Sequence, residues 1–217
     1  MKFKNRLFGN VQLKKSVGLS FKKKKMTELE RVIQTKDCDN LISFLEKYPQ
    51  TDKTLWKNAA MPLRRDCADE LVLVLLQKIQ TPSEFEASKY IIDLVYNGLI
   101  KCAEYVLDTF PVDVNYKDEV KGSVLTIAVR HSHTEFALML MDIPGIDLNV
   151  TNCNKRNPVW FAAANHDKVV LDKLLELGAQ TLEVDAENTL PEERTTDELA
   201  FHIRNNQDLG INELALL

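Results

Sequence analysis

The sequence predicts an all-α protein built from repeated pairs of helices. Glycine and proline number only 7 each among 217 residues, which argues against a sandwich or barrel with its many turns. The longest apolar run, residues 71–76, is far shorter than the roughly 18 residues of a membrane span. Apolar positions recur every 34 residues. These three observations indicate a soluble array of helical repeats.

The repeat is visible at two independent sets of positions. The first set is a pair of neighbouring apolar residues, found at 72–73, 106–107, 140–141 and 174–175. The second set consists of small or apolar residues, namely Ala60, Leu94, Ala128 and Ala162. A single short unit cannot bury its own apolar face, so neighbouring units must stack. We therefore expect the paired positions to fill the core, and the alanines to let adjacent first helices approach closely.

Each unit is expected to form a helix, a tight turn and a second helix. Residues 124–130 (VLTIAVR) are mostly apolar, a polar break follows at 131–133, and apolar residues then recur at helical spacing through 141. The next unit repeats this order. Pro158 suits the first position of a helix, where its missing N–H costs nothing, and Gly178 suits the position after a helix ends.

The best-preserved unit, residues 157–179, reads NPVWFAAANHDKVVLDKLLELGA. It resembles the ankyrin-repeat pattern T-P-L-H-x-A-A-x-x-G-H-x-x-V-V-x-x-L-L-x-x-G-A. The segments YIIDLVYNGLIKCAEYVLD and SVLTIAVRHSHTEFALMLM resemble it more loosely, and 114–115 and 148–149 match the V-N that precedes each finger of the family. A diverged cap, ELERVIQTKDCDNLISFLEKYP, and a closing first helix, TTDELAFHIRNN, flank these units.

The resemblance is best over 88–180 and covers about residues 26–217. It implies an ankyrin-repeat solenoid of about five to six helix–turn–helix units with short hairpin fingers. The units are expected near 26–50, 54–80, 88–114, 122–148, 156–180 and, at the end, 190–217. Only Pro158 keeps the family's proline, and Ser132 and His166 replace the turn glycine. We therefore expect these two residues to adopt a strained left-handed backbone.

The resemblance also implies a function, because members of this family usually bind proteins through the finger tips and the exposed face of the first helices. The corresponding finger positions are Phe85, Glu86, Ser88, Glu119, Val120, Gly122, Cys153, Asn154 and Arg156. The helix positions are Tyr96, Asn97, Arg130, His131, Ala164 and Asn165. Tyr96 and Arg130 are the residues expected to contribute most to binding. The chain is thus expected to be a monomeric, non-catalytic scaffold that binds another protein.

Catalysis and cofactors find little support in the sequence. Motifs for phosphate, dinucleotide or metalloprotease chemistry are absent. A nucleophilic Cys153 would need a nearby base, yet the histidines belong to the helix–helix turns at the other end of the unit. His131, His133 and His166 beside Asp167 could hold zinc, but a structural role in the turns is preferred. We therefore expect no enzyme activity, no metal and no cofactor.

The cysteines and the N-terminus favour the cytoplasm, with the nucleus as the alternative. Cys38, Cys67, Cys102 and Cys153 form no C-x-x-C pair, and residues 1–25 lack the apolar core of a secretory signal. Reduced thiols are expected in such a protein.

Charge divides the chain in two. Residues 1–25 carry nine basic side chains and no acidic one, whereas the rest holds the other 19 of the 28 basic residues and all 32 acidic ones, for a net charge of −13. The basic arm is interpreted as a disordered tail, with a nuclear-import patch or a membrane-surface helix as alternatives. The acidic body disfavours nucleic acid. The acidic stretch 183–198 is expected to be an extended solvated finger, or else to dock the basic arm.

Two other functional classes stay open. Divergent arrays of this kind also resemble the cytoplasmic region of painless-like TRP cation channels, of which this chain could be a soluble relative or fragment. A substrate adaptor of a ubiquitin ligase would need a recognisable C-terminal box, and the ending NELALL matches none.

Overall fold

The computed structural model describes residues 27–51, 54–55, 58, 69–80, 82–181, 185–196, 200–201 and 203–204. These residues form nine α-helices, one 3-10 helix and no strand, which confirms the predicted all-α class for them. The helices are α1 (Glu28–Gln34), α2 (Cys38–Lys47), α4 (Asp69–Gln77), α5 (Glu84–Tyr96), α6 (Ile100–Thr109), α7 (Val124–Arg130), α8 (Thr134–Met141), α9 (Pro158–Ala164), α10 (Lys168–Glu176) and the 3-10 helix η1 (Pro191–Arg194). The basic arm 1–25, Ala60 and Cys67 lie outside the described residues.

Consecutive helices form hairpins through tight turns that repeat in one register. Gly98, Ser132 and His166 lie 34 residues apart and all have a left-handed backbone, with φ of 79°, 58° and 56°. The residue after each of them donates its N–H to a carbonyl five residues back, as His133 does to Ala128 at 2.9 Å. This closure requires a positive φ at the turn residue. The strained conformation predicted for Ser132 and His166 is thus confirmed.

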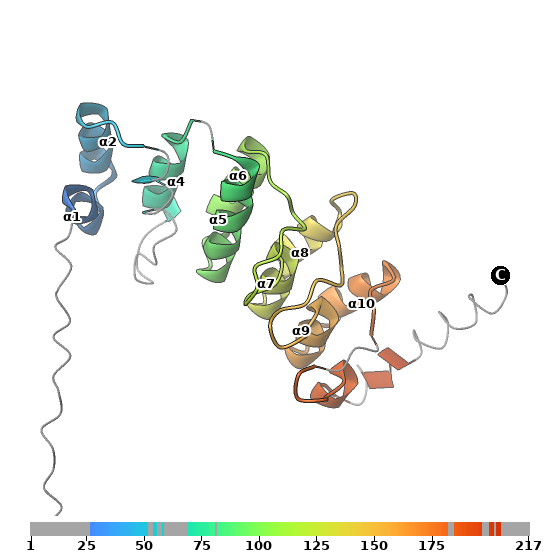
Figure 1. Ribbon diagram of the computed structural model, residues 1–217. Coiled ribbons are helices and arrows are strands. Elements are labelled where there is room, and N and C mark those ends of the chain that lie inside the picture. The colour runs from blue at the N-terminus through green and yellow to red at the C-terminus, as the bar shows by residue number, and fades with distance from the viewer. Residues whose placement is uncertain are drawn as a thin grey trace, which may run out of the picture.

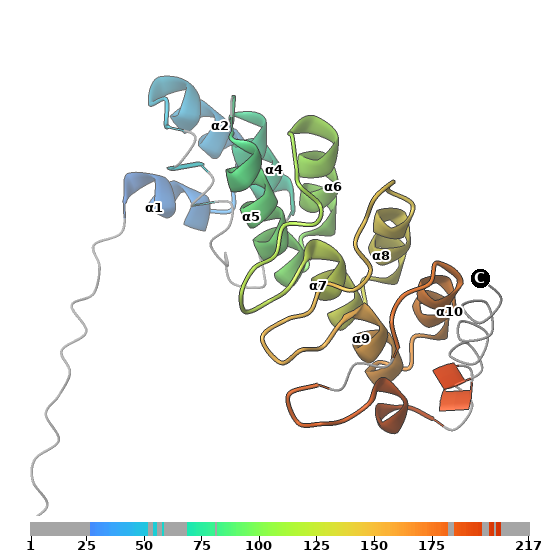
Figure 2. The same ribbon diagram turned by 45° about the vertical axis from the view of Figure 1, so that its right-hand side comes forward.

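The helix pairs lie side by side in a row that runs from α1 to α10 (Figure 1). The first helices α5, α7 and α9 contact one another in that order, and η1 packs against α9. Among the second helices, α2 contacts α4, α4 contacts α6, and α8 contacts α10. The loops that lead into α7 and α9 and the loop after α10 project toward the same side (Figure 2). Neighbouring pairs therefore present equivalent residues next to one another.

The core runs along the whole row and uses the residues that the 34-residue period selects. Leu140 and Leu174 have no exposed surface, and neither have Ala128 and Ala162 at the contact between α7 and α9. Pro158 occupies the start of α9, and Gly178 follows the end of α10 with a φ of 79°. These predictions are confirmed.

Helix α5 begins earlier than the sequence suggested. Ser83 and Glu86 form a capping box, in which the Ser83 hydroxyl accepts the N–H of Glu86 and the Glu86 carboxylate accepts the N–H of Ser83. This reciprocal cap starts the helix at Glu84. The prediction that Phe85, Glu86 and Ser88 lie in a finger is therefore wrong, because all three belong to the first turns of α5.

The acidic stretch near the C-terminus is only in part the solvated finger that we expected. Asp185 is buried rather than solvated, and Pro191–Arg194 form a 3-10 helix that packs against α9. Farther on, residues 200–201 and 203–204 are helical, and Ile203 is fully buried. The expectation of an extended solvated segment is therefore wrong for Asp185 and for residues 191–194, whereas the helical residues 200–201 and 203–204 agree with the helix predicted over TTDELAFHIRNN.

Candidate protein-binding surface

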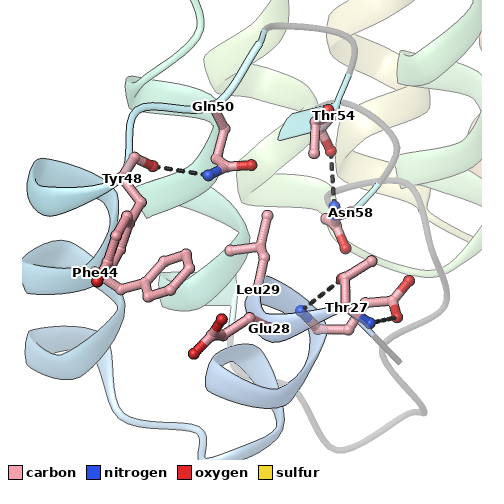
Figure 3. A pocket seen from close by; sticks show the side chains of 9 residues that line it. Thr27, Glu28, Leu29, Phe44, Tyr48, Gln50, Thr54 and Asn58 are labelled. Carbon is pink, nitrogen blue, oxygen red and sulfur yellow. Dashed lines mark hydrogen bonds between the residues drawn. The ribbon is translucent and has the colours of Figure 1, made fainter. Parts of the chain in front are cut away.

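A hollow of about 420 Å³ opens at the N-terminal end of the described chain (Figure 3). It is lined by Thr27, Glu28, Leu29, Glu30, Phe44, Tyr48, Gln50, Thr54 and Asn58. Its polar groups bond locally: the Asn58 amide donates to the Thr54 carbonyl at 2.8 Å, and the Thr27 N–H donates to Glu30 at 2.7 Å. The residues that line the hollow therefore include no pair of a nucleophile and its base, and none of the residues predicted to bind a partner.

The predicted helix positions lie together at the C-terminal ends of the first helices. Tyr96, Arg130 and Ala164 are the last residues of α5, α7 and α9, and Asn97, His131 and Asn165 follow them as C-caps. All are exposed except Ala164, which is half-buried. Because α5, α7 and α9 stack in register, these six residues form a row, which we call the helix-end row.

The N-terminal part of the helix-end row is a cluster around Tyr96. The Tyr96 ring lies edge-on to the His131 ring, with centroids 5.0 Å apart, and is 42% exposed. The ammonium group of Lys121 lies 4.7 Å from the centroid of the Tyr96 ring and forms an ion pair with Asp93. The Asn97 amide donates to the Asp93 carbonyl at 2.7 Å, which ties the end of α5 to its own last turn. Residues from two neighbouring units therefore hold the tyrosine in one orientation.

The central part of the helix-end row is Arg130. Its guanidinium lies over the Phe161 ring of α9, with its carbon 5.7 Å from the ring centroid. The Asn165 amide donates to the carbonyls of Val129 and Arg130, at 2.8 and 3.2 Å. These two carbonyls end α7, where the helix supplies no donor four residues on, and the Val129 carbonyl also accepts the N–H of Ser132 at 3.1 Å. Asn165 thus joins α9 to α7, and its exposed side chain has a structural function.

The predicted finger tips are tight turns, each closed by one polar side chain. The side-chain oxygen accepts backbone N–H groups from within the turn at Asp118, Asn152 and Asp185. Backbone hydrogen bonds also join neighbouring turns, from Cys153 N–H to the Val120 carbonyl at 3.3 Å and from Ala186 N–H to the Asn154 carbonyl at 2.9 Å. Glu119, Val120, Cys153 and Asn154 are exposed. The tips therefore form a second continuous row.

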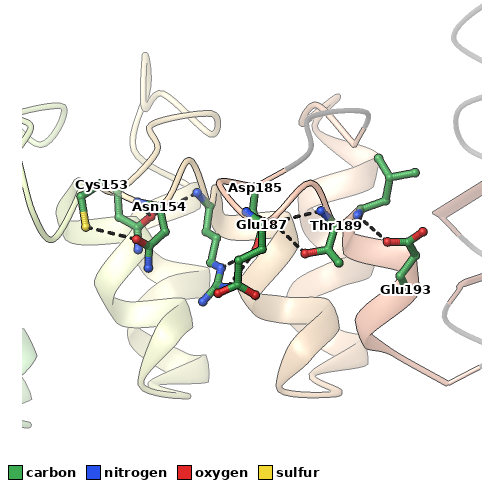
Figure 4. A network of polar contacts seen from close by, with 9 residues as sticks. Cys153, Asn154, Asp185, Glu187, Thr189 and Glu193 are labelled. Carbon is green, nitrogen blue, oxygen red and sulfur yellow. Dashed lines mark hydrogen bonds and ion pairs between the residues drawn. The ribbon is translucent and has the colours of Figure 1, made fainter.

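Arg156 belongs to an internal network and not to the open surface. Its guanidinium contacts the Asp185 carboxylate at 2.9 Å and Glu187 at 3.4 Å, and lies 3.9 Å from the centroid of the Trp160 ring. Its side chain is 17% exposed, and that of Asp185 is 0% exposed. Figure 4 shows Asp185, Glu187 and Thr189 on one loop, facing the loop that carries Cys153 and Asn154.

Hydrogen bonding keeps the Asp185 carboxyl of this network ionised. Burial by itself raises the pKa of the Asp185 carboxyl. Hydrogen bonds donated by Thr189, Arg156 and Glu187 outweigh the burial and hold this pKa well below its usual value. Asp185 is therefore ionised at neutral pH, and the ion pair joins the last two finger turns.

Three of the predicted binding residues are thus structural. Ser88 is buried, donates to the Glu84 carbonyl and accepts the N–H of Asp113. Gly122 is also buried, with a φ of 89°, and a Cβ there would lie 3.1 Å from the Thr126 side chain. Arg156 is paired as described. The prediction that these three residues face a partner is wrong. Ser88 and Gly122 are buried, and the Arg156 guanidinium is already paired with Asp185.

Sequence reasoning missed Asp93, Lys121, Trp160 and Asp185. One signal was present, since Asp118, Asn152 and Asp185 recur at spacings of 34 and 33 before each finger turn. The local sequence does not predict the Lys121–Asp93 ion pair, because its two residues are 28 positions apart.

Burial shifts the pKa values of Cys102, His131 and His133. Burial, and then the Asp69 charge, raises the pKa of the Cys102 thiol to about 12. Burial also lowers the pKa of both His131 and His133, which favours neutral rings at pH 7. No group of three metal-ligating side chains comes together in the part of the chain that the structure describes.

Two findings concern the chain as compared with known protein families and with the length of a membrane span. No protein-family model matches the chain. None of the helices in the described ranges has both the length and the apolar composition needed to cross a bilayer.

Proposed function

We propose that the chain is a non-catalytic scaffold of ankyrin-like repeats that binds a partner protein through the helix-end row and the exposed finger tips. The helix-end row is the observation that carries this proposal. Six residues in a 34-residue register come from three consecutive units and lie on helices packed against one another. A surface held in place before binding loses little conformational entropy when a partner binds.

The assignment to ankyrin-like repeats is supported by recurring local structure. The left-handed residues at 98, 132 and 166 occupy equivalent turns, and polar side chains at 118, 152 and 185 close equivalent fingers. Neighbouring units are also joined by asparagine side chains. Asn115 accepts the N–H of Asp147 at 2.7 Å, and Asn149 accepts the N–H of Gln180 at 2.8 Å. Such nearest-neighbour contacts are typical of solenoid repeats.

The compartment is part of the same proposal. Cys38, Cys102 and Cys153 are free thiols. Thiols are the form in which cysteines persist in the reducing cytoplasm and nucleus. We therefore place the scaffold in one of these compartments.

The test compares which proteins co-purify with matched surface variants. The first variant carries Tyr96→Ala and Arg130→Ala in the helix-end row. The control carries Lys101→Ala and Val169→Ser at exposed positions of the second helices α6 and α10. Asn165 stays unchanged because its amide caps α7. Both variants must first show the melting curve of the wild-type chain.

A partner of the proposed surface is retained by the wild-type chain and by the control, and is reduced at least roughly tenfold by the row variant, as expected when contact hot spots are removed. The same protein, once purified, must show this order of affinities in a direct titration. Equal retention by both variants would exclude the helix-end row as the binding surface. A chain that retains no protein in any form would contradict the scaffold function itself.

A further inference from the structure

We propose that the partner segment bound at the helix-end row is acidic, with Arg130 pairing with a carboxylate and Tyr96 contacting an apolar side chain next to it. This inference rests on the proposed function and specifies the chemistry of the partner. It follows from how the basic side chains of this face are neutralised.

Two other basic side chains already have carboxylate partners, namely Lys121 beside Tyr96 and Arg156 in the internal network of the finger turns. Lys121 pairs with Asp93, and Arg156 pairs with the buried carboxylate of Asp185. Among the residues that the structure describes, no carboxylate lies within ion-pair distance of Arg130. Within the described residues, the recorded contact of its guanidinium is with the Phe161 ring, 5.7 Å from the ring centroid. Arg130 therefore carries a positive charge that no carboxylate of the described residues neutralises, so a carboxylate of a partner can pair with it.

The Arg130 guanidinium is also not needed to cap the C-terminal end of α7. The carbonyls at the end of α7 accept hydrogen bonds from the Asn165 amide, so they do not need the Arg130 side chain. The contact with Phe161 holds the guanidinium in one region, which lowers the entropy lost when it binds. Arg130 is in this sense prepared to form a bidentate pair.

A partner that covers Arg130 must supply a negative charge. Burying a guanidinium without a counter-ion is costly, whereas a carboxylate matches its planar pair of N–H donors. Tyr96, on the neighbouring unit of the row, is partly exposed and is held by His131 and Lys121, so its ring offers a fixed apolar contact. An acidic segment with an apolar residue satisfies both groups.

The charge of the whole body makes this local arrangement selective. Residues 26–217 carry a net charge of −13, which repels acidic segments in general. Attraction at physiological salt extends only about 8 Å, so it is felt close to Arg130 and not over the whole surface. The position of Arg130 thus determines where an acidic segment can bind.

The experiment selects random dodecapeptides displayed on phage against four purified full-length chains. The chains are the wild type, Arg130→Glu, Arg130→Lys and Lys101→Glu, and all must first melt alike. Lys101→Glu makes the same change of charge at an exposed position on α6 and serves as the matched control. Enriched peptides are then synthesised and titrated against each chain at low and high salt.

Peptides selected by the wild type are expected to be enriched in Asp and Glu together with an apolar residue. Arg130→Glu should weaken their binding at least about tenfold and reduce its dependence on salt, because it replaces an attractive charge with a repulsive one. Arg130→Lys should keep part of the affinity, and Lys101→Glu nearly all of it.

Three results would overturn the inference. The selected peptides could lack acidic enrichment, their affinity could be unchanged by Arg130→Glu, or the wild type could select no peptide. In the first two cases the selected peptides are also titrated against a fifth chain, Tyr96→Ala, and loss of their binding there would still support binding at the row, so the proposed function would survive. In the third case the proposed function is judged by its own co-purification experiment.

Discussion

Removal of the Asp185 carboxylate is expected to destabilise the C-terminal end of the array more than any change of an exposed acid. Asp185→Ala removes an acceptor that bonds Glu187 N–H at 2.9 Å, Thr189 N–H at 3.0 Å and the Thr189 hydroxyl at 2.7 Å. It also leaves Arg156, with 17% of its side chain exposed, without its buried counter-ion. Both losses act on the same pair of finger turns.

The magnitude follows from these contacts. Breaking a fully buried ion pair by removing one partner costs about 3–5 kcal/mol. Arg156 keeps its contact with Glu187 at 3.4 Å, and the residues whose N–H groups are freed are exposed (Glu187) or half-buried (Thr189), so the loss is smaller. We expect about 2–4 kcal/mol for Asp185→Ala. Glu187→Gln is the matched control, because the Glu187 side chain is 65% exposed, and it should cost less than about 1 kcal/mol.

The assay is urea denaturation followed by circular dichroism and by tryptophan fluorescence, since Trp160 lies under the Arg156 guanidinium. Hydrogen exchange of residues 185–196 distinguishes opening of this end from unfolding of the whole array. If Asp185→Ala and Glu187→Gln lose equal stability, or if Asp185→Ala stays within about 1 kcal/mol of the wild type, the buried ion pair does not hold the last turns together.

Three further predictions concern the core and the turns. Leu140→Ala should lower the free energy of unfolding by about 2–5 kcal/mol, measured by chemical denaturation, because the side chain is fully buried. Met139→Ala, on the exposed side of α8, should lower it by less than about 1 kcal/mol. Similar losses for the two variants would contradict the assigned core. Ser132→Gly should raise stability by up to about 1 kcal/mol, because it relieves a φ of 58°. A lower denaturation midpoint would refute this account of the turn. The pKa of His133 is lowered by burial, so its contribution to stability is present above the unfolded pKa of 6.5 and is lost as the pH falls through the folded pKa. His133→Gln, which can still donate to the Val95 carbonyl, should therefore lose less stability than the wild type between about pH 7.5 and 5.5, measured by thermal melts, and an identical loss would exclude His133 as the titrating group.

Much of the fold could be predicted from the sequence because its signals are local and repeat. The 34-residue period identified the fully buried Leu140 and Leu174, and comparison with the ankyrin-repeat pattern, which has glycine at the turn, pointed to the left-handed backbone of Ser132 and His166. Helical spacing and turn geometry depend on a few neighbouring residues. A repeat displays the same dependence several times, which makes it recognisable.

The proposed binding surface could be predicted only as a set of positions. The sequence predicted Tyr96, Arg130 and Asn165 on the exposed face of the first helices, and the structure places them at the C-terminal ends of α5, α7 and α9. It could not tell that the Asn165 amide caps α7, or that Ser88 is buried under the loop at Asp113. Family-like positions are defined by register, whereas exposure depends on the particular side chains around them.

The sequence by itself therefore determined the helical class, the repeat length, the core positions and the strained turns. Only the tertiary structure decided which of the predicted surface residues remain free to bind. Arg156 and Asp185 are separated by 29 residues, and their pairing depends on how two finger turns approach each other in space. Burial and ion pairing are properties of such distant contacts, and the local pattern of a chain does not contain them.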